Sequence, residues 1–288
     1  MPGAGEATLF EVLRPDRLAA PLVLDSPHSG TIYPSDFAPV QPSERYRRAE
    51  DMYVDELFSA APALGLPLLK ALFGRIYCDV NRAFDDLDPA VLDDAQGLDL
   101  APSGKARLGK GVVWTATPPD GAPLLAGPLL RTDYLARLER CWHPYHATLA
   151  ELLGEIRAAH GRVFHLDLHS MQPVANAMHE DATGSLRPDI VLSDREGTSA
   201  TAGYLEVARD LLLGLGFSVK VNDPFKGAEI LRRHGDPARG VHSLQIEINR
   251  ALYMNVEHYG KTARFDDTRQ RLSAFLTSLR DWAAKSSG

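Results

Sequence analysis

Two histidines directly follow segments that are expected to be strands. His28 lies in the turn-rich segment Asp-Ser-Pro-His-Ser-Gly, and His169 ends the run Val-Phe-His-Leu-Asp-Leu-His. In folds that alternate strands with helices, ligands bind just beyond the carboxyl ends of the strands. Two imidazoles and one carboxylate make the usual open zinc site, whose fourth position is left to water. Glu50 and Asp51, at the start of the next expected helix, are the candidate carboxylates, and the alternative is that each histidine only packs or caps a turn.

The second of these strands carries two further titratable side chains. At about 3.3 Å per residue, Asp167 and His169 share one face and lie about 6.6 Å apart, whereas His165 is roughly 13 Å from His169. Because His165 and His169 are too far apart to bind one metal ion, we expect His165 to be structural.

The segment Leu244–Arg250 alternates between apolar and polar residues, and its polar face carries Gln245, Glu247 and Asn249. If helices cover both faces of the sheet, polar groups on an inner strand are costly unless each has a partner. Burial would raise the pKa of Glu247, which suits a general base that takes a proton from water. The alternative is an edge strand with one face in solvent.

A third segment is expected to form a strand over residues 76–80 that ends in Asn81 and Arg82. Arginine binds carboxylates through two parallel hydrogen bonds, so this end favours an acidic substrate even though the chain itself is acidic. The alternative is a structural ion pair with the following loop, residues 85–99, which contains six aspartates. We expect that loop to be solvated or to act as a lid, because it lacks the ordered spacing of a calcium-binding loop.

Two cysteines and one histidine pair are not expected to be reactive. Cys78 and Cys141 lie within apolar patterns, which predicts that both are buried and inert. His143 and His146 lie three residues apart on a helical pattern, and a position on the helix surface explains them better than a metal pair does.

Strand-like and helix-like segments alternate along the chain without an internal repeat or a long linker. The expected strands are 22–24, 68–73, 76–80, 111–117, 163–168, 190–192, 218–221 and 244–248. The expected helices are 44–61, 130–160, 199–214 and 261–284, and Gly161 is a usual helix stop. This pattern predicts one α/β domain over residues 1–288, with three layers: a mostly parallel or mixed sheet and helices on both of its faces.

The composition excludes several functional classes. The 288 residues include 31 Lys and Arg against 38 Asp and Glu, a net charge of −7, which argues against non-specific nucleic-acid binding and against a polybasic membrane anchor. No stretch approaches the ~18 apolar residues of a membrane span, and the first residues lack the pattern of a signal peptide. We therefore expect a soluble cytoplasmic protein, a monomer or small homo-oligomer, that binds neither nucleic acid nor membrane.

Several short segments, taken together and in order, resemble the N-formylglutamate amidohydrolase family. They are Ser26–Gly30, Glu50–Leu57, Tyr77–Arg82, Asp167–Ser170, Asn222–Gly227 and Gln245–Asn249. The resemblance implies a zinc-dependent hydrolase with the phosphorylase/hydrolase-like fold of zinc carboxypeptidases, which cleave amide bonds beside a carboxylate. Family members in histidine breakdown often carry Asp-Thr-Asp-Trp-His, where residues 49–53 of this chain read Ala-Glu-Asp-Met-Tyr.

The same resemblance implies a metal site and a catalytic base. His28 and His169 would be metal ligands. Asp51 is the preferred acidic ligand, because the family commonly shows an aspartate two residues before an aromatic residue, and Glu50 is the alternative. Glu247 matches the general base of carboxypeptidase-like sites.

The remaining expected roles concern the substrate and the support of the metal ligands, and among them the resemblance implies those of Asn81 and Arg82. Arg75 would stabilise the oxyanion, the substrate would be held by Asn81, Arg82 and Asn249, and Asp167 and Ser170 would support the ligands. The expected reaction is the Zn²⁺-dependent hydrolysis of a small acidic N-acyl amino acid: N-formyl-L-glutamate and water would give L-glutamate and formate. The alternatives are another divalent metal, a metallo-amidase or deacylase on another N-acyl amino acid or peptide, and a non-catalytic binding protein on the same fold.

Overall fold

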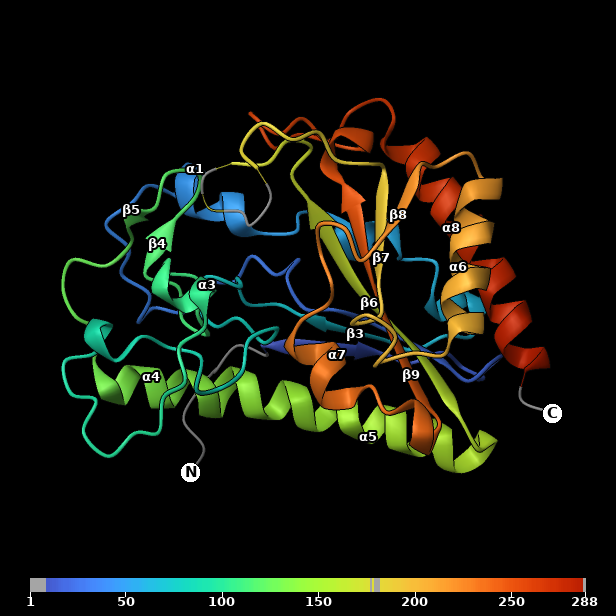
Figure 1. Cartoon of the computed structure of the whole chain (residues 1–288), viewed down its shortest axis with the longest axis horizontal. Helices are drawn as coiled ribbons and strands as arrows, with labels where there is room; N and C mark the ends of the chain where they lie inside the picture. Colours follow the sequence, from blue (N-terminus) through green and yellow to red (C-terminus); the bar gives the residue numbers. More distant parts are fainter. Residues whose placement is uncertain (1–8, 177, 179–181, 287–288) are drawn as a thin grey trace.

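A seven-stranded mixed sheet forms the centre of the computed structural model, which describes residues 9–176, 178 and 182–286 (Figure 1). The strand order is β1-β3-β2-β6-β9-β7-β8. The central strands β3, β2, β6 and β9 are mutually parallel, whereas β1 and β7 are antiparallel to β3 and β9, and β8 is parallel to β7. The strands are β1 (Phe10–Leu13), β2 (Leu22–Ser26), β3 (Leu68–Ala71), β6 (Val163–Met171), β7 (Ile190–Ser193), β8 (Val219–Val221) and β9 (Val241–Asn249), and a separate hairpin pairs β4 (Ala116–Thr117) with β5 (Ala122–Pro123).

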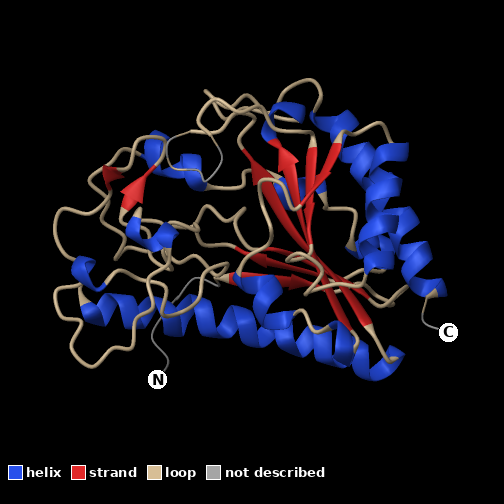
Figure 2. Cartoon of the chain, viewed as in Figure 1, coloured by secondary structure: helices blue, strands red, loops and turns tan. Residues whose placement is uncertain are grey.

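Helices cover both faces of this sheet (Figure 2). One face packs on α5 (His143–His160), and the other packs on α2 (Val54–Leu57), α6 (Ala202–Gly214) and α8 (Phe265–Lys285). The shorter helices are α1 (Ser43–Tyr46), α3 (Gly104–Arg107), α4 (Arg131–Arg137) and α7 (Glu229–His234). The expectation of a mixed α/β sheet between two helical layers is therefore confirmed. Within the described residues, no helix combines the length and apolarity needed to cross a membrane.

The alternation of side chains along the strands separates two hydrophobic cores. Leu24, Leu166 and Ile246 point to the α6 and α8 side, whereas Val23 points to the α5 side. The α5 side is also where the intervening polar residues lie. Because β9 lies between β6 and β7, the alternative of an edge strand with a wet face is wrong.

Two of the expected strands are wrong. Residues 76–80 form turns and irregular chain, and within 111–117 only β4 pairs as a strand. Ile76, Cys78 and Val80 are nevertheless fully buried in the α5-side core. A run of apolar residues indicates that a segment is buried, but burial alone does not distinguish a strand from a packed loop.

The expected helix over 44–61 is broken into α1, a 3₁₀ turn (Arg47–Ala49) and α2. The break falls at Glu50, which is extended, and Asp51, which is outside any helix, and the backbone N–H of Asp51 donates to the carbonyl of His28. Tyr53 then adopts a left-handed conformation (φ 65°) before α2 begins. Tertiary contact to the β2 end therefore overrides the helical periodicity here.

The other elements follow the expected pattern with shifted ends. The helix over 130–160 is continuous through α4, a π-helical turn (Leu138–Trp142) and α5, and it stops at Gly161 with φ 77°. Strands β6 and β9 are longer than expected, α8 begins four residues later, and β1 and α7 were not expected.

The structure confirms the expectation for the two cysteines but not the one for His146. Cys78 and Cys141 are both buried and free, as expected. The surface position expected for His146 is wrong, because this ring is buried, lies 2.9 Å from the ring of His234 and contacts the carbonyl of Val80 at 2.8 Å.

Candidate active site

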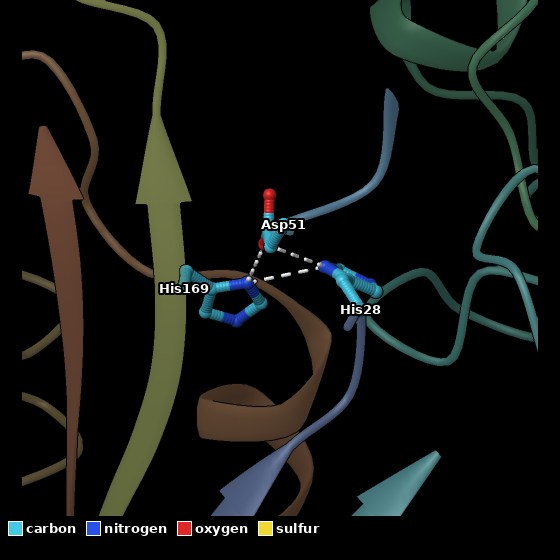
Figure 3. Close-up of side chains that lie close together, drawn as sticks. All are labelled: His28, Asp51 and His169. Carbon is cyan, nitrogen blue, oxygen red and sulfur yellow. Dashed lines mark hydrogen bonds and ion pairs between the residues drawn. The ribbon is translucent and has the colours of Figure 1, made fainter. Parts of the chain in front are cut away.

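Three buried side chains from separate segments meet at the carboxyl ends of β2 and β6. His28 follows β2, Asp51 lies in the break before α2, and His169 is part of β6 (Figure 3). The Nδ1 atoms of His28 and His169 are 3.1 Å apart. Oδ2 of Asp51 lies 3.0 Å from Nδ1 of His169 and 3.4 Å from Nδ1 of His28. The structure thus brings together three of the four residues considered as metal ligands.

A carboxylate faces the outer nitrogen of each histidine. Nε2 of His28 is 2.8 Å from Oδ1 of Asp79, and Nε2 of His169 is 2.8 Å from Oδ1 of Asp167. Such a carboxylate keeps the proton on Nε2 and leaves Nδ1 as the lone pair that can bind a metal. The oxygens of Asp167 have no well-aligned hydrogen bond, so its contact with His169 is mainly electrostatic.

The same two carboxylates differ in acidity. Burial raises the pKa of Asp167, although the charge of His169 opposes this effect. Burial would also raise the pKa of Asp79, but the charges of Arg75 and His28 outweigh it and hold that pKa well below its usual value. The Asp79 carboxylate therefore stays ionised beside His28.

The donor set fits a divalent cation such as Zn²⁺. Two ligand atoms that each lie about 2.0–2.1 Å from a tetrahedral ion are roughly 3.3 Å apart. The separations within the cluster, between 3.0 and 3.4 Å, have this size. Two imidazole lone pairs and one carboxylate oxygen converge, and a cation satisfies all three together.

The second oxygen of Asp51 is held on the opposite side. Oδ1 accepts hydrogen bonds from Nη2 of Arg250 at 3.0 Å and from Oγ of Ser170 at 3.3 Å, and Nη1 of Arg75 lies 3.8 Å away. Burial would raise the pKa of Asp51, but its contacts with the rings of His169 and His28 and the charge of Arg75 hold that pKa well below its usual value. Asp51 is therefore an anion that presents one oxygen to the histidines.

Glu50, the other candidate carboxylate, is turned away from the histidines. Its side chain accepts hydrogen bonds from the hydroxyl of Tyr33 at 2.8 Å and from Nε of Arg47 at 3.0 Å. Burial raises the pKa of Glu50, while these hydrogen bonds oppose the shift. Within the described residues, the metal-compatible cluster contains Asp51 and not Glu50.

Glu247 lies beside His169 in the neighbouring strand. The register of β6 and β9 pairs these two residues, so their side chains emerge next to each other on one face. Burial raises the pKa of Glu247 to about 7, the charge of His169 opposes this shift, and the charge of Asp51 adds to it. Nε2 of Gln245 donates a hydrogen bond of 2.8 Å to Oε1 of Glu247. A buried carboxyl group of this pKa can exchange a proton near neutral pH.

A cavity of about 390 Å³ opens onto the cluster, and its described lining residues include more cationic than acidic side chains. Among the described lining residues, only Asp51 and Glu247 are acidic. The cationic lining residues are Arg48, Arg75, Arg82, Lys105, Lys110, Arg187, Lys226 and Arg250. Such a wall attracts an anionic ligand even though the chain as a whole carries a net charge of −7.

Of the residues considered for contact with the substrate, some line the cavity and one does not. Arg75, Asn81 and Arg82 line the cavity, and the Asn81 amide nitrogen lies 3.1 Å from Nε2 of His169. Asn249 is absent from the described cavity wall: its side chain donates to the carbonyls of Arg187 and Pro188 and caps the following 3₁₀ turn.

His165 belongs to a separate buried network. Its Nε2 lies 2.8 Å from Oδ1 of Asp25, its Nδ1 lies 2.7 Å from Oγ of Ser243, and the hydroxyl of Tyr145 also donates to Asp25. This network gives the buried side chains of Asp25, His165 and Ser243 hydrogen-bond partners, which fits the expectation that His165 is structural.

Sequence reasoning assigned no role to Asp79 or Arg250. Asp79 lies within Tyr77–Arg82, one of the segments that carry the family resemblance, and Arg250 directly follows β9. The sequence signals for a role were the position of Asp79 inside an apolar segment and the position of Arg250 just beyond β9. Their partners, His28 and Asp51, come from distant parts of the chain and could not be read from spacing.

The fold and this cluster define a mixed α/β protein with a candidate metal centre in a cationic cavity. The family model of N-formylglutamate amidohydrolase matches residues 20–254, and the chain belongs to this family. It is 31% identical to the N-formylglutamate deformylase of Pseudomonas aeruginosa over 281 residues, which cover 94% of this chain and 97% of the relative. The N-formylglutamate deformylase of Pseudomonas putida is 29% identical over 273 residues, which cover 92% of this chain and 94% of the relative.

Among solved structures, the chain is similar to the N-formylglutamate amidohydrolase of Ralstonia eutropha JMP134. The TM-score is 0.93 at 37% sequence identity, and the match covers 97% of this chain and 100% of that chain. The family resemblance of the short sequence segments is therefore confirmed.

Proposed function

We propose that this chain is a metal-dependent amidohydrolase that converts N-formyl-L-glutamate and water to L-glutamate and formate. The proposal rests above all on the convergence of His28, Asp51 and His169 beside Glu247 at one end of a cationic cavity. The relatives named N-formylglutamate deformylase, which match over most of their length, support this substrate.

The metal is proposed to be zinc, because two imidazole nitrogens and one carboxylate oxygen are a usual open zinc donor set. When bound by these residues, zinc would supply a Lewis acid that polarises the formyl carbonyl and lowers the pKa of water to about 7. Asp79 and Asp167 would fix the two imidazole rings through their Nε2 atoms.

Glu247 carries the proton through the reaction. Its carboxylate takes a proton from the attacking water while the water oxygen bonds to the formyl carbon. The resulting carboxyl group gives that proton to the nitrogen as the carbon–nitrogen bond breaks, which releases formate and the free amine of the amino acid. A pKa of about 7 allows Glu247 to act in both directions.

Cationic side chains position and stabilise the substrate. Arg75 lines the cavity and would stabilise the negative charge that develops on the formyl oxygen. Arg82, supported by Asn81, would hold the α-carboxylate of the substrate.

The test combines the metal content of the purified chain with formate release from N-formyl-L-glutamate. We expect about one zinc ion per chain, formate release that a chelator abolishes, and recovery on adding zinc back. His28→Ala should lose the metal and the activity, whereas His143→Ala, which alters a half-exposed histidine of α5, should keep both. Formate release that is unaffected by complete metal removal would contradict the proposal.

A further inference from the structure

Two arginines of the cavity wall carry a charge that no carboxylate of the described chain pairs with. Arg75 and Arg250 form ion pairs with Asp79 and Asp51. Within the described residues, the side chain of Arg82 instead donates only to the backbone carbonyls of Lys110 and Asn81. Neutral carbonyls orient a guanidinium but leave its charge uncompensated.

Arg48 is the second of these arginines. Arg48 lines the cavity, and its side chain has neither a hydrogen bond nor an ion pair with any other described residue. A guanidinium normally finds acceptors for its fixed fork of five N–H donors. A guanidinium that faces a cavity without such acceptors is available to an anionic ligand.

The local backbone fixes the position of Arg48. The 3₁₀ turn Arg47–Ala49 has about three residues per turn, so neighbouring side chains point in different directions. Arg47 pairs with Glu50, and neither of these two residues lines the cavity, whereas Arg48 does. The carbonyl of Arg48 accepts a 3.0 Å hydrogen bond from Nη1 of Arg250, which also holds Asp51. This contact anchors Arg48 next to the catalytic cluster.

We propose that Arg48 binds the side-chain carboxylate of the substrate and so selects N-acyl derivatives of dicarboxylic amino acids. The proposal rests on the proposed function and adds a second anion site to it. A substrate with two carboxylates supplies one partner for Arg82 and one for Arg48. The side-chain carboxylate is assigned to Arg48 because Asn81, beside Arg82, is proposed to support the α-carboxylate.

The test compares N-formyl-L-glutamate with N-formyl-L-glutamine, which has the same shape but no side-chain charge. Arg48→Gln should lower kcat/KM for the glutamate substrate about 10- to 100-fold, mainly through KM, and leave the glutamine substrate nearly unchanged. Arg48→Lys should restore part of the preference, because it keeps the charge but loses the fork. The matched control is Arg45→Gln, which alters an arginine outside the cavity wall that pairs with Asp120 and should change neither substrate.

The outcomes separate this proposal from the one on which it rests. Arg82→Gln should lower kcat/KM for both substrates, since both carry the α-carboxylate. Arg48→Gln with an intact preference for glutamate, or with equal losses on both substrates, would overturn the role of Arg48 alone. Wild-type protein that contains zinc but hydrolyses neither substrate would overturn the proposed function itself.

Discussion

Arg250 holds Asp51 by one oxygen and leaves the other free for the histidines. Nη2 of Arg250 donates to Oδ1 at 3.0 Å, while Oδ2 lies 3.0 Å from Nδ1 of His169. A carboxylate held in this way offers one oxygen, so a cation in the cluster would keep a coordination position for water or substrate. Arg250 therefore acts on the site through the orientation of Asp51.

We expect Arg250→Lys to weaken zinc binding about 10- to 100-fold, which is typical for the loss of a partner that orients a metal ligand. Lysine keeps the charge but cannot contact Asp51, Ser170 and the carbonyl of Arg48 together. Competition with a chelator of known zinc affinity measures the change. Arg269→Lys, at an exposed ion pair on α8, is the control. Equal zinc affinity of the Arg250 variant and the wild type would contradict this role.

We expect Glu247→Gln to lower kcat about 10²- to 10⁴-fold, because glutamine has a similar shape but cannot accept the proton of the attacking water. The zinc content should remain unchanged, since Glu247 lies outside the cluster of His28, Asp51 and His169. Initial rates of formate release and metal analysis on the same sample measure both quantities. Glu257→Gln, at an exposed position, is the matched control. Nearly wild-type turnover by the Glu247→Gln variant would exclude Glu247 as the base.

The rate should depend on the ionisation of Glu247. Its carboxylate form is the active base, and burial raises the pKa of Glu247 to about 7. A zinc ion nearby favours the anion and lowers this pKa, so kcat/KM should rise with pH along a limb between pH ~5 and pH ~7. A pH–rate profile of the zinc-loaded wild type measures the limb. A rate that is constant down to pH ~5 would contradict it.

The buried ring of His146 and the partly buried ring of His234 beside it should make the fold sensitive to acid. Burial lowers the pKa of His146 to about 4 and, together with the charge of His146, that of His234 to about 2. Both pKa values lie below the value of about 6.5 in the unfolded chain. The two histidines therefore contribute full stability above pH ~6.5, and this contribution is lost as the pH falls below ~6.5. At pH 5 the loss is on the order of 2 kcal/mol for each histidine.

Urea unfolding of the metal-free chain at two pH values tests this dependence. Between pH 7 and pH 5, His234→Gln should reduce the drop in the free energy of unfolding by about 2 kcal/mol. His258→Gln, at an exposed position, should leave the drop unchanged. The same drop in the His234 variant as in the wild type would show that this ring titrates normally in the folded chain.

The sequence predicts the framework of the site better than its details. Periodicity identifies the long helix ending at Gly161, and strands β2, β6 and β9 place His28, His169 and Glu247 at one edge of the sheet. The choice between Glu50 and Asp51 depends on a break in a helical pattern, and only the contact of that segment with the end of β2 creates the break.

Contacts between distant segments account for the remaining differences. Ile76 and Val80 satisfy the pattern of a buried strand but pack as irregular chain over α5. Asp79 contacts His28, and Arg250 contacts Asp51. Arg250 and Asp51 lie far apart in the sequence, so no local pattern predicts their contact. Arg47 and Arg48 are neighbours in one 3₁₀ turn, yet Arg47 pairs with Glu50 and Arg48 lines the cavity. The sequence does not predict this difference, because it depends on how the turn packs in the fold.

The register of β6 and β9 has a consequence for how the site fails under denaturing conditions. The nine residue pairs that join these central strands include the pair of His169 and Glu247, so the backbone amides of both residues should exchange with solvent only on global unfolding. Asp51 lies in a short irregular segment between small helices, which can open locally at a lower free energy. We therefore expect mild denaturant to release the metal through the Asp51 segment first, while the sheet that carries the base is still intact.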